Sequence, residues 1–123
     1  MNDKRRFSFQ ARLSSFGYAF SGLWSFLRSE HNAWIHLFVA TVTLILSFLV
    51  HISAGEWIAV ILCMAMVITT EILNTVIEKI MDHLSPEYST SVKTIKDMAA
   101  AAVLVTSIAA AITGLIIFIP RFI

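Results

Sequence analysis

Charged residues are scarce in this 123-residue chain, at 14% of all residues, whereas soluble domains carry about 25%. The one cysteine, Cys63, excludes a framework of disulfides within the chain. The opening stretch, residues 1–6, lacks the apolar run of a cleavable signal peptide, so we expect none. Neither G-x-x-x-x-G-K followed by Ser or Thr nor G-x-G-x-x-G occurs, so the sequence lacks the common glycine-rich phosphate motifs.

Hydrophobic residues, by contrast, make up 58% of the chain, and three long runs of them are predicted to cross a membrane. A helix of about 20 residues spans roughly 30 Å of hydrocarbon. Between the second and third runs, residues 83–95 are polar, and Pro86 prevents one straight helix from continuing through them. We therefore predict an all-α membrane protein with a single domain, 1–123, in which this polar stretch is a loop. The predicted spans cover about 33–53, 57–81 and 97–119.

Ahead of these runs, residues 7–30 carry large apolar side chains at spacings of three and four. This pattern is typical of an amphipathic helix whose other face is too polar to cross a bilayer. Because basic residues accompany it, we predict that it lies on the anionic membrane surface; packing against a soluble partner is the alternative. The apolar positions are Phe9, Leu13, Phe16, Phe20, Leu23 and Leu27, and the basic ones are Lys4, Arg5, Arg6, Arg12 and Arg28.

The basic residues are distributed unevenly about the spans. Five of the nine precede the first span, three lie in or beside the 83–95 loop, and only Arg121 follows the third span. The 51–56 turn between the first two spans contains none. The positive-inside rule therefore predicts that the N-terminus and the 83–95 loop are cytoplasmic.

The second span contains two carboxylates and a carboxamide on one helix face. Glu71, Asn74 and Glu78 stand at i, i+3 and i+7, which places them within about 60° of one another around a helix. An ionisable side chain deep in an apolar helix is costly and is usually functional. Asp82 extends the same face to the predicted cytoplasmic surface.

Carboxylates and a lysine at a water–lipid boundary suit phosphate chemistry with a divalent metal. Mg²⁺ prefers one or two carboxylates together with the phosphate oxygens of a substrate, a role that Glu30 and Glu78 would fill. Lys96 would offset the charge of the phosphates. Glu71 lies deeper in the membrane, where a general base for a lipid hydroxyl would stand.

Simpler interpretations compete with several of these assignments. Glu30 and Glu78 are also explained as interface charges, Asp97 as a charge that stabilises the N-terminus of the third span, and His36 as a packing residue. For the whole protein the residues leave open a membrane enzyme that handles a phosphate, a small proton-coupled transporter with Glu71 as the relay, and a structural membrane subunit.

Two motifs in register resemble the signature of the small prokaryotic diacylglycerol kinase family. They are Glu71-Ile-Leu-Asn-Thr-Val-Ile-Glu78, followed by Asp82, and Lys96-Asp-Met-Ala-Ala-Ala-Ala-Val103. The resemblance extends over nearly the whole chain, from Gly17-Tyr18 and Glu30 through the three spans. It implies a homotrimer with active sites shared between subunits, in the bacterial cell (inner) membrane, that phosphorylates a lipid primary hydroxyl with MgATP. The implied partners are ATP, a membrane lipid alcohol and further copies of the chain, with no nucleic acid.

The resemblance also implies a role for each matched residue. Glu71 would be the catalytic base with Asn74 beside it, and Glu30 and Glu78 would bind Mg²⁺. The nucleotide would contact Tyr18, Glu30, Glu78, Glu87, Tyr88, Ser89, Lys96 and Asp97. The lipid would be bordered by Glu71, Asn32, His36, Trp57 and Ala100.

Two local patterns bear on the lipid. Residues 30–36 read E-x-N-x-x-x-H and residues 114–120 read G-L-I-I-F-I-P, and both look like the undecaprenol kinase branch of Gram-positive bacteria. The resemblance therefore favours undecaprenol, with diacylglycerol as the alternative. Both lipids carry a primary hydroxyl on a long apolar body, so the catalytic residues do not separate them.

Overall fold

The computed structural model describes residues 7–123, so the predicted surface charges Lys4, Arg5 and Arg6 lie outside the described residues. All the regular secondary structure of the described chain is helical, which confirms the predicted all-α class. Its elements are α1 (Phe9–Ser29), α2 (His31–Leu49), α3 (Ala54–Leu84), α4 (Thr90–Phe118) and a short 3₁₀ helix, η1 (Ile119–Arg121).

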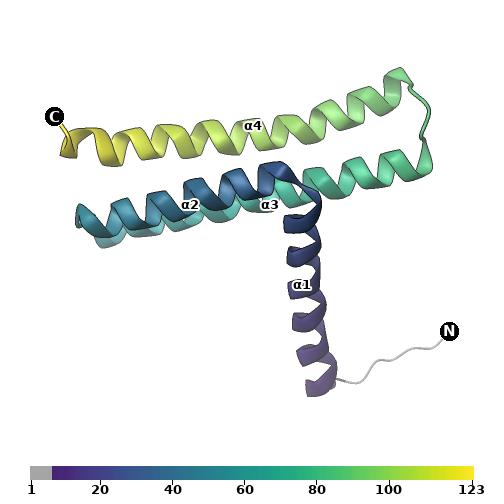
Figure 1. Cartoon of the computed structure of the whole chain (residues 1–123), viewed down its shortest axis with the longest axis horizontal. Coiled ribbons are helices and arrows are strands. Elements are labelled where there is room, and N and C mark those ends of the chain that lie inside the picture. Colours follow the sequence, from purple (N-terminus) through teal and green to yellow (C-terminus); the bar gives the residue numbers. More distant parts are fainter. Residues whose placement is uncertain (1–6) are drawn as a thin grey trace.

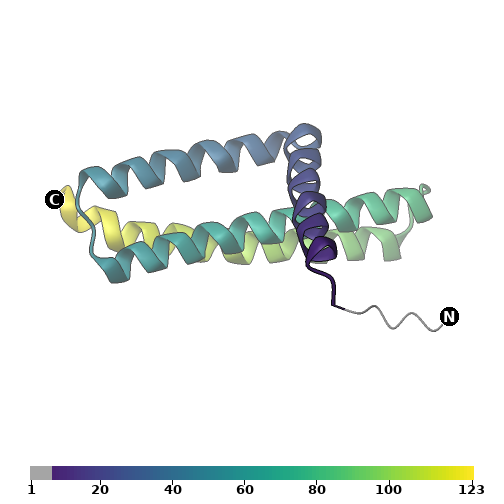
Figure 2. The ribbon, with the colours of Figure 1, turned by 90° about the horizontal axis from the view of Figure 1, so that it is seen from below.

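Three of the helices run side by side, and the fourth turns away from them. α2, α3 and α4 share one long direction, whereas α1 leaves the group across that direction (Figures 1 and 2). The corner between α1 and α2 is Glu30, whose extended backbone (φ −124°, ψ 121°) ends one helix and begins the next. Glu30 therefore stands at the corner between the two helices.

The antiparallel pair of α3 and α4 is joined at three levels. Near one end, Arg121 donates hydrogen bonds of 2.6 and 2.9 Å to the two carboxylate oxygens of Glu56. Midway, the hydroxyls of Thr70 and Thr106 lie 2.9 Å apart. At the other end, Lys96 of α4 donates to the Asp82 carboxylate of α3. These contacts fix the register of the two helices.

The α2–α3 connection ends α2 sharply and begins α3 with a well-formed cap. His51 takes a left-handed conformation, with φ 55°, just after α2. Ser53 then accepts a hydrogen bond from the Glu56 backbone N–H, and the Glu56 carboxylate accepts one from the Ser53 N–H, which is a capping box.

The predicted polar loop over 83–95 is mostly wrong. α3 continues to Leu84 and α4 begins at Thr90, so only 85–89 of this stretch is non-helical. Pro86 does interrupt the helix as predicted. The Ser89 hydroxyl begins α4 early by accepting from the Val92 N–H, which satisfies one of the free donors of the first turn.

Because α3 has 31 residues, it is about 46 Å long at 1.5 Å per residue, longer than the roughly 30 Å of hydrocarbon in a bilayer. The extra turns carry Asp82 of α3, and Lys93 and Lys96 of α4, beyond the apolar region. For the same reason Asp97 is not at the start of α4 but two turns inside it, where it pairs with Lys93.

The apolar surface of the described chain is largely uncovered. α2, α3 and the stretch Thr90–Arg121 are each long and apolar enough to cross a membrane. Large side chains such as Leu104, Val105 and Ile116 remain at least 60% exposed. The one cluster of buried apolar residues, within 7–123, is Ile52, Val60 and Ile117 near the α2–α3 turn. Lipid or further protein must cover the rest, as expected of an integral membrane protein.

Candidate functional site

The carboxylate of Glu71 is buried in the middle of the molecule and is paired with a histidine. Glu71 lies on α3 and is 7% exposed. Its Oε1 atom lies 2.8 Å from the Nε2 atom of His36 on α2. Ionisable groups among apolar helices require a partner and mark functional positions. Glu71, the acidic residue least expected in an apolar span, is therefore also the one that the fold buries.

An apolar groove of about 400 Å³ begins beside this pair. It lies between α2, α3 and α4, and His36 is one of its lining residues. Apart from a few hydroxyl, thiol and imidazole groups its walls are aliphatic, so it suits a hydrocarbon chain. The lining residues are Ile35, His36, Val39, Ala40, Thr43, Val60, Cys63, Met64, Val67, Ile68, Ser107, Ala110, Ala111, Thr113, Gly114 and Phe118.

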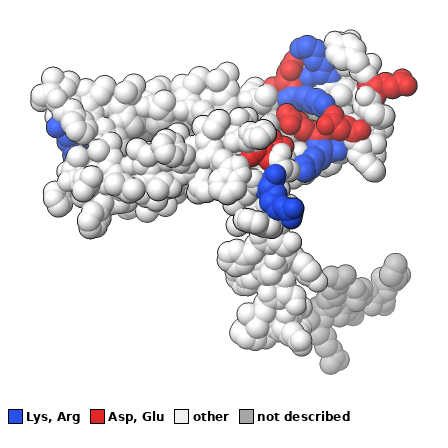
Figure 3. All heavy atoms as spheres, in the orientation of Figure 1, with Lys and Arg blue, Asp and Glu red and all other residues white. Residues whose placement is uncertain are grey.

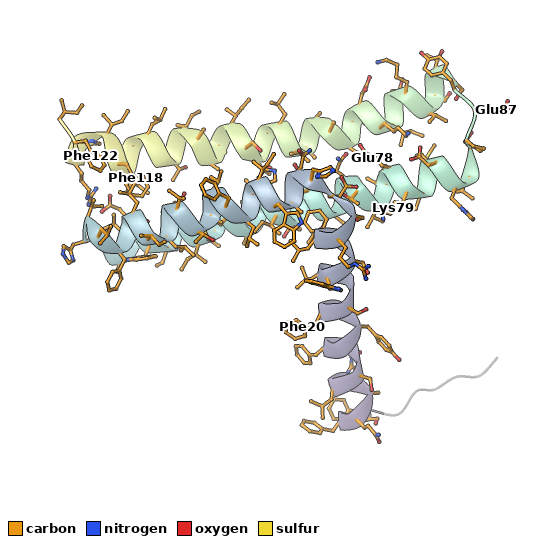
Figure 4. The ribbon with its side chains drawn as sticks, viewed as in Figure 1. Phe20, Glu78, Lys79, Glu87, Phe118 and Phe122 are labelled. Carbon is orange, nitrogen blue, oxygen red and sulfur yellow. The ribbon has the colours of Figure 1, made fainter. Side chains whose placement is uncertain are left out.

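The predicted polar face of α3 continues from Glu71 toward the charged end of the molecule. Asn74 lies one turn further on, and its buried Oδ1 has no hydrogen-bond partner among the described residues. Glu78 follows, half-buried, and points into the space between α3 and α4, whereas Lys79 points away from it (Figure 4). Along the helix axis, Glu71 and Glu78 are separated by about 10 Å.

A second hollow, of about 300 Å³, lies where α3 passes into α4. Four of the residues predicted to contact the nucleotide line this hollow: Glu87, Tyr88, Lys96 and Asp97. Charged side chains gather at this end of the molecule (Figure 3). Ser89, also predicted for the nucleotide, adjoins the hollow as the cap of α4. The remaining lining residues are Asp82, Ser85, Pro86, Val92 and Lys93.

The fold of the single chain does not bring every predicted residue to these two hollows. Tyr18 is 77% exposed on α1, which projects away from the other helices (Figure 1), and neither Tyr18 nor Glu30 lines the second hollow. Asn32 is exposed in the first turn of α2, and Ala100 is exposed on α4. Trp57 packs near the opposite end of α3, beside the Ile52 cluster.

The metal site predicted from Glu30 and Glu78 is not completed by other ligands of the same chain. Within residues 7–123, no group of three or more His, Cys, Asp and Glu side chains is placed to hold a metal ion. The donors near Glu78 are nevertheless hard oxygen atoms, including the unpartnered Oδ1 of Asn74. A cation that takes its other ligands from phosphate and water fits such a set.

Two features of the site were missed in the sequence. Lys93 lines the second hollow beside Lys96. The i, i+3 spacing of the two lysines places them on one helix face, and this spacing would have predicted the position of Lys93. The contact between His36 and Glu71 joins residues that are 35 positions apart. No local spacing signals such a pair, because it depends on how α2 is rotated against α3.

Comparison with known proteins decides between the enzyme, transporter and structural interpretations. Residues 17–118 match the family described as prokaryotic diacylglycerol kinase. The chain belongs to this family. It is 37% identical over 107 residues to an undecaprenol kinase of Bacillus subtilis, a match that covers 87% of each chain. It is 33% identical over 109 residues to a diacylglycerol kinase of Synechocystis, covering 88% of this chain and 62% of that protein.

Membership of the prokaryotic diacylglycerol kinase family confirms the resemblance read from the two motifs. The chain is accordingly an integral-membrane lipid kinase rather than a transporter or a structural subunit. The matched segment, residues 17–118, contains every residue that the motifs predicted for the site.

Proposed function

We propose that this chain transfers the γ-phosphate of MgATP to the primary hydroxyl of undecaprenol, giving undecaprenyl phosphate. The observation that carries this proposal is the position of Glu71, a buried carboxylate in contact with His36, which lines an apolar groove. A lipid chain in the groove would present its hydroxyl to Glu71, which acts as the general base. Asn74, one turn along the same face, would hold the hydroxyl through its free Oδ1.

Mg²⁺ would be held by Glu78 and Glu30 and by the phosphates of ATP. The observation that supports the fit is the set of hard oxygen donors on the face of α3 that points toward α4. Bound there, Mg²⁺ would neutralise charge that develops on the transferred phosphoryl group. Glu78 lies about 10 Å along the helix from Glu71, which leaves room for a phosphate chain between base and metal ligand.

The nucleotide would occupy the second hollow, where Lys93 and Lys96 provide positive charge. Phosphoryl transfer depends mainly on positioning and on electrostatic stabilisation of the phosphates. Lys96 would contact the phosphates directly, and Glu87, Tyr88, Ser89 and Asp97 would surround the rest of the nucleotide. Tyr18 would complete this site from α1.

The active enzyme would be a homotrimer whose sites are shared between subunits. Support comes from Tyr18 and Glu30, which lie outside the nucleotide hollow of their own chain. A neighbouring subunit would then supply them. The largely uncovered apolar faces of α2 and α4 would pack in part against neighbouring copies.

The membrane orientation would place the active site in the cytoplasm, where ATP is available. The N-terminus and the 85–89 connection would face the cytoplasm of a bacterium, with the spans in its inner membrane, as the positive-inside rule predicts. α1 would lie along the membrane surface through its apolar face. Asn32, His36, Trp57 and Ala100 would border the lipid.

Undecaprenol is favoured over diacylglycerol by the relatives. The undecaprenol kinase of Bacillus subtilis matches at higher identity, and over more of its own length, than the diacylglycerol kinase of Synechocystis. Diacylglycerol remains the second candidate, because it offers the same primary hydroxyl to the same base.

A single assay tests the substrate. The purified protein is given radiolabelled ATP with undecaprenol and diacylglycerol in separate, otherwise identical micelles, and the phosphorylated lipids are quantified. We expect faster transfer to undecaprenol. Equal rates, or faster transfer to diacylglycerol, would overturn the substrate assignment.

A further inference from the structure

One side-chain contact joins α2 to the buried carboxylate of Glu71 on α3. The Nε2 atom of His36 lies 2.8 Å from Oε1 of Glu71, with the two side chains 25% and 9% exposed. An ionised carboxylate can only accept hydrogen bonds. A general base acts in its ionised form, so in that form of Glu71 the hydrogen of the contact lies on Nε2 and His36 donates it.

This contact engages only one of the two carboxylate oxygens. Among residues 7–123, the structure gives Oε2 of Glu71 no hydrogen-bond partner. His36 also lines the apolar groove, so the contact stands beside the place where a lipid chain would enter. One oxygen is thus fixed by α2 while the other is left for a ligand.

We propose that His36 is a positioning residue that orients the catalytic base Glu71; this rests on the proposed function. The Nε2–H of His36 holds Oε1, so that Oε2 faces the lipid hydroxyl. Oε2 takes the hydroxyl proton, the lipid oxygen bonds to the γ-phosphorus, and the bond from that phosphorus to the bridging oxygen breaks to release ADP. His36 does not touch the transferred group.

A free glutamate side chain has three rotatable bonds, and a base must stand within hydrogen-bond reach of its proton. A third group that orients the base is the usual solution in enzymes. In the case of His36 the orienting group comes from a different helix. The position of α2 against α3 therefore sets the geometry of the base, and α2 also forms one wall of the groove.

The test compares two amides at position 36. In His36→Gln the side-chain N–H₂ stands about where Nε2 stands in histidine, so it still reaches Glu71. In His36→Asn the amide is shorter by one methylene and stops near the position of Nδ1, so it does not. Both side chains are polar and neither can carry a positive charge, which makes them a matched pair. Lipid phosphorylation is measured as kcat and as KM for ATP, on protein whose assembly is checked by size-exclusion chromatography.

We expect His36→Asn to lower kcat by about 10- to 100-fold, the range typical of residues that orient a functional group, with the KM for ATP unchanged. We expect His36→Gln to keep most of the activity. Thr106→Val is the structural control, because it removes the other hydrogen bond between helices near this level and should leave kcat nearly unchanged.

Several outcomes would overturn the positioning role. The first is a kcat of His36→Asn equal to that of the wild type. The second is a kcat of His36→Gln as low as that of His36→Asn. The third is a kcat of Thr106→Val as low as that of His36→Asn. A His36→Asn protein that fails to assemble would assign His36 a structural role instead. If the wild type phosphorylates neither lipid, the proposed function fails and takes this role with it. If the wild type is active and only the variants disagree, the positioning role alone fails.

Discussion

Lys96 of α4 and Asp82 of α3 form an ion pair at the end of the molecule where one helix passes into the other, with Nζ 2.5 Å from Oδ1. The Lys96 side chain is 35% exposed and that of Asp82 is 67% exposed. Ion pairs in contact with water are weak. Lys96 can therefore exchange Asp82 for the more highly charged phosphates of a nucleotide in the adjoining hollow.

We expect Lys96→Met to weaken the binding of MgATP. A hydrogen bond to a charged group contributes about 1.5–3 kcal/mol, so the KM for ATP should rise by about 10- to 100-fold while the KM for lipid stays the same. The measurement is steady-state phosphorylation at varied ATP. Lys79→Met provides the matched control, since Lys79 points away from the space between α3 and α4 (Figure 4). Equal changes in the two variants would remove Lys96 from the nucleotide site.

Glu78 is expected to set the Mg²⁺ concentration that the kinase activity requires. The variant Glu78→Gln keeps the size and one oxygen donor of the side chain but loses its charge. The Mg²⁺ concentration required for half-maximal activity should rise by about tenfold or more, because Mg²⁺ is bound through only one or two carboxylates. Titration of activity with Mg²⁺ after treatment with EDTA measures this. An unchanged Mg²⁺ dependence would exclude Glu78 as a ligand.

The apolar groove is expected to hold the lipid chain. Ala111 lines the groove, and Ala111→Trp would fill part of its 400 Å³ with an indole ring. The KM for lipid should rise by about 10-fold, as expected when a bulky side chain competes for an apolar pocket, whereas the KM for ATP should not change. Ala109→Trp, on the same helix but outside the groove, is the control. Loss of activity in both variants alike would argue against the groove as the lipid site.

Much of this architecture could be predicted from the sequence, because it follows from local periodicity. The three spans and the shared face of Glu71, Asn74 and Glu78 depend only on apolar run length and on 3.6 residues per turn. The loop over 83–95 was overpredicted for a physical reason. Hydropathy does not distinguish a polar helix in water from a loop, and the cap at Ser89 starts α4 one residue later, at Thr90.

The long-range part of the site could not be predicted from one chain. The contact between His36 and Glu71 depends on how two helices are rotated against each other, which no local spacing encodes. Tyr18 was matched by resemblance alone and Glu30 also by its carboxylate, yet neither lines the nucleotide hollow of its own chain. Residues supplied by a neighbouring copy, as we propose for these two, leave no periodic signal in the sequence of a single chain.

The central claim is that Glu71 is the base that activates a lipid hydroxyl, and Glu71→Gln tests it most directly. General bases contribute about 10²- to 10⁴-fold to rate, so lipid phosphorylation by Glu71→Gln should fall by at least about 100-fold while the protein still assembles. The binding of MgATP, measured separately by calorimetry, should remain because the nucleotide hollow does not include Glu71. Phosphorylation of lipid by assembled Glu71→Gln at the wild-type rate would contradict the account.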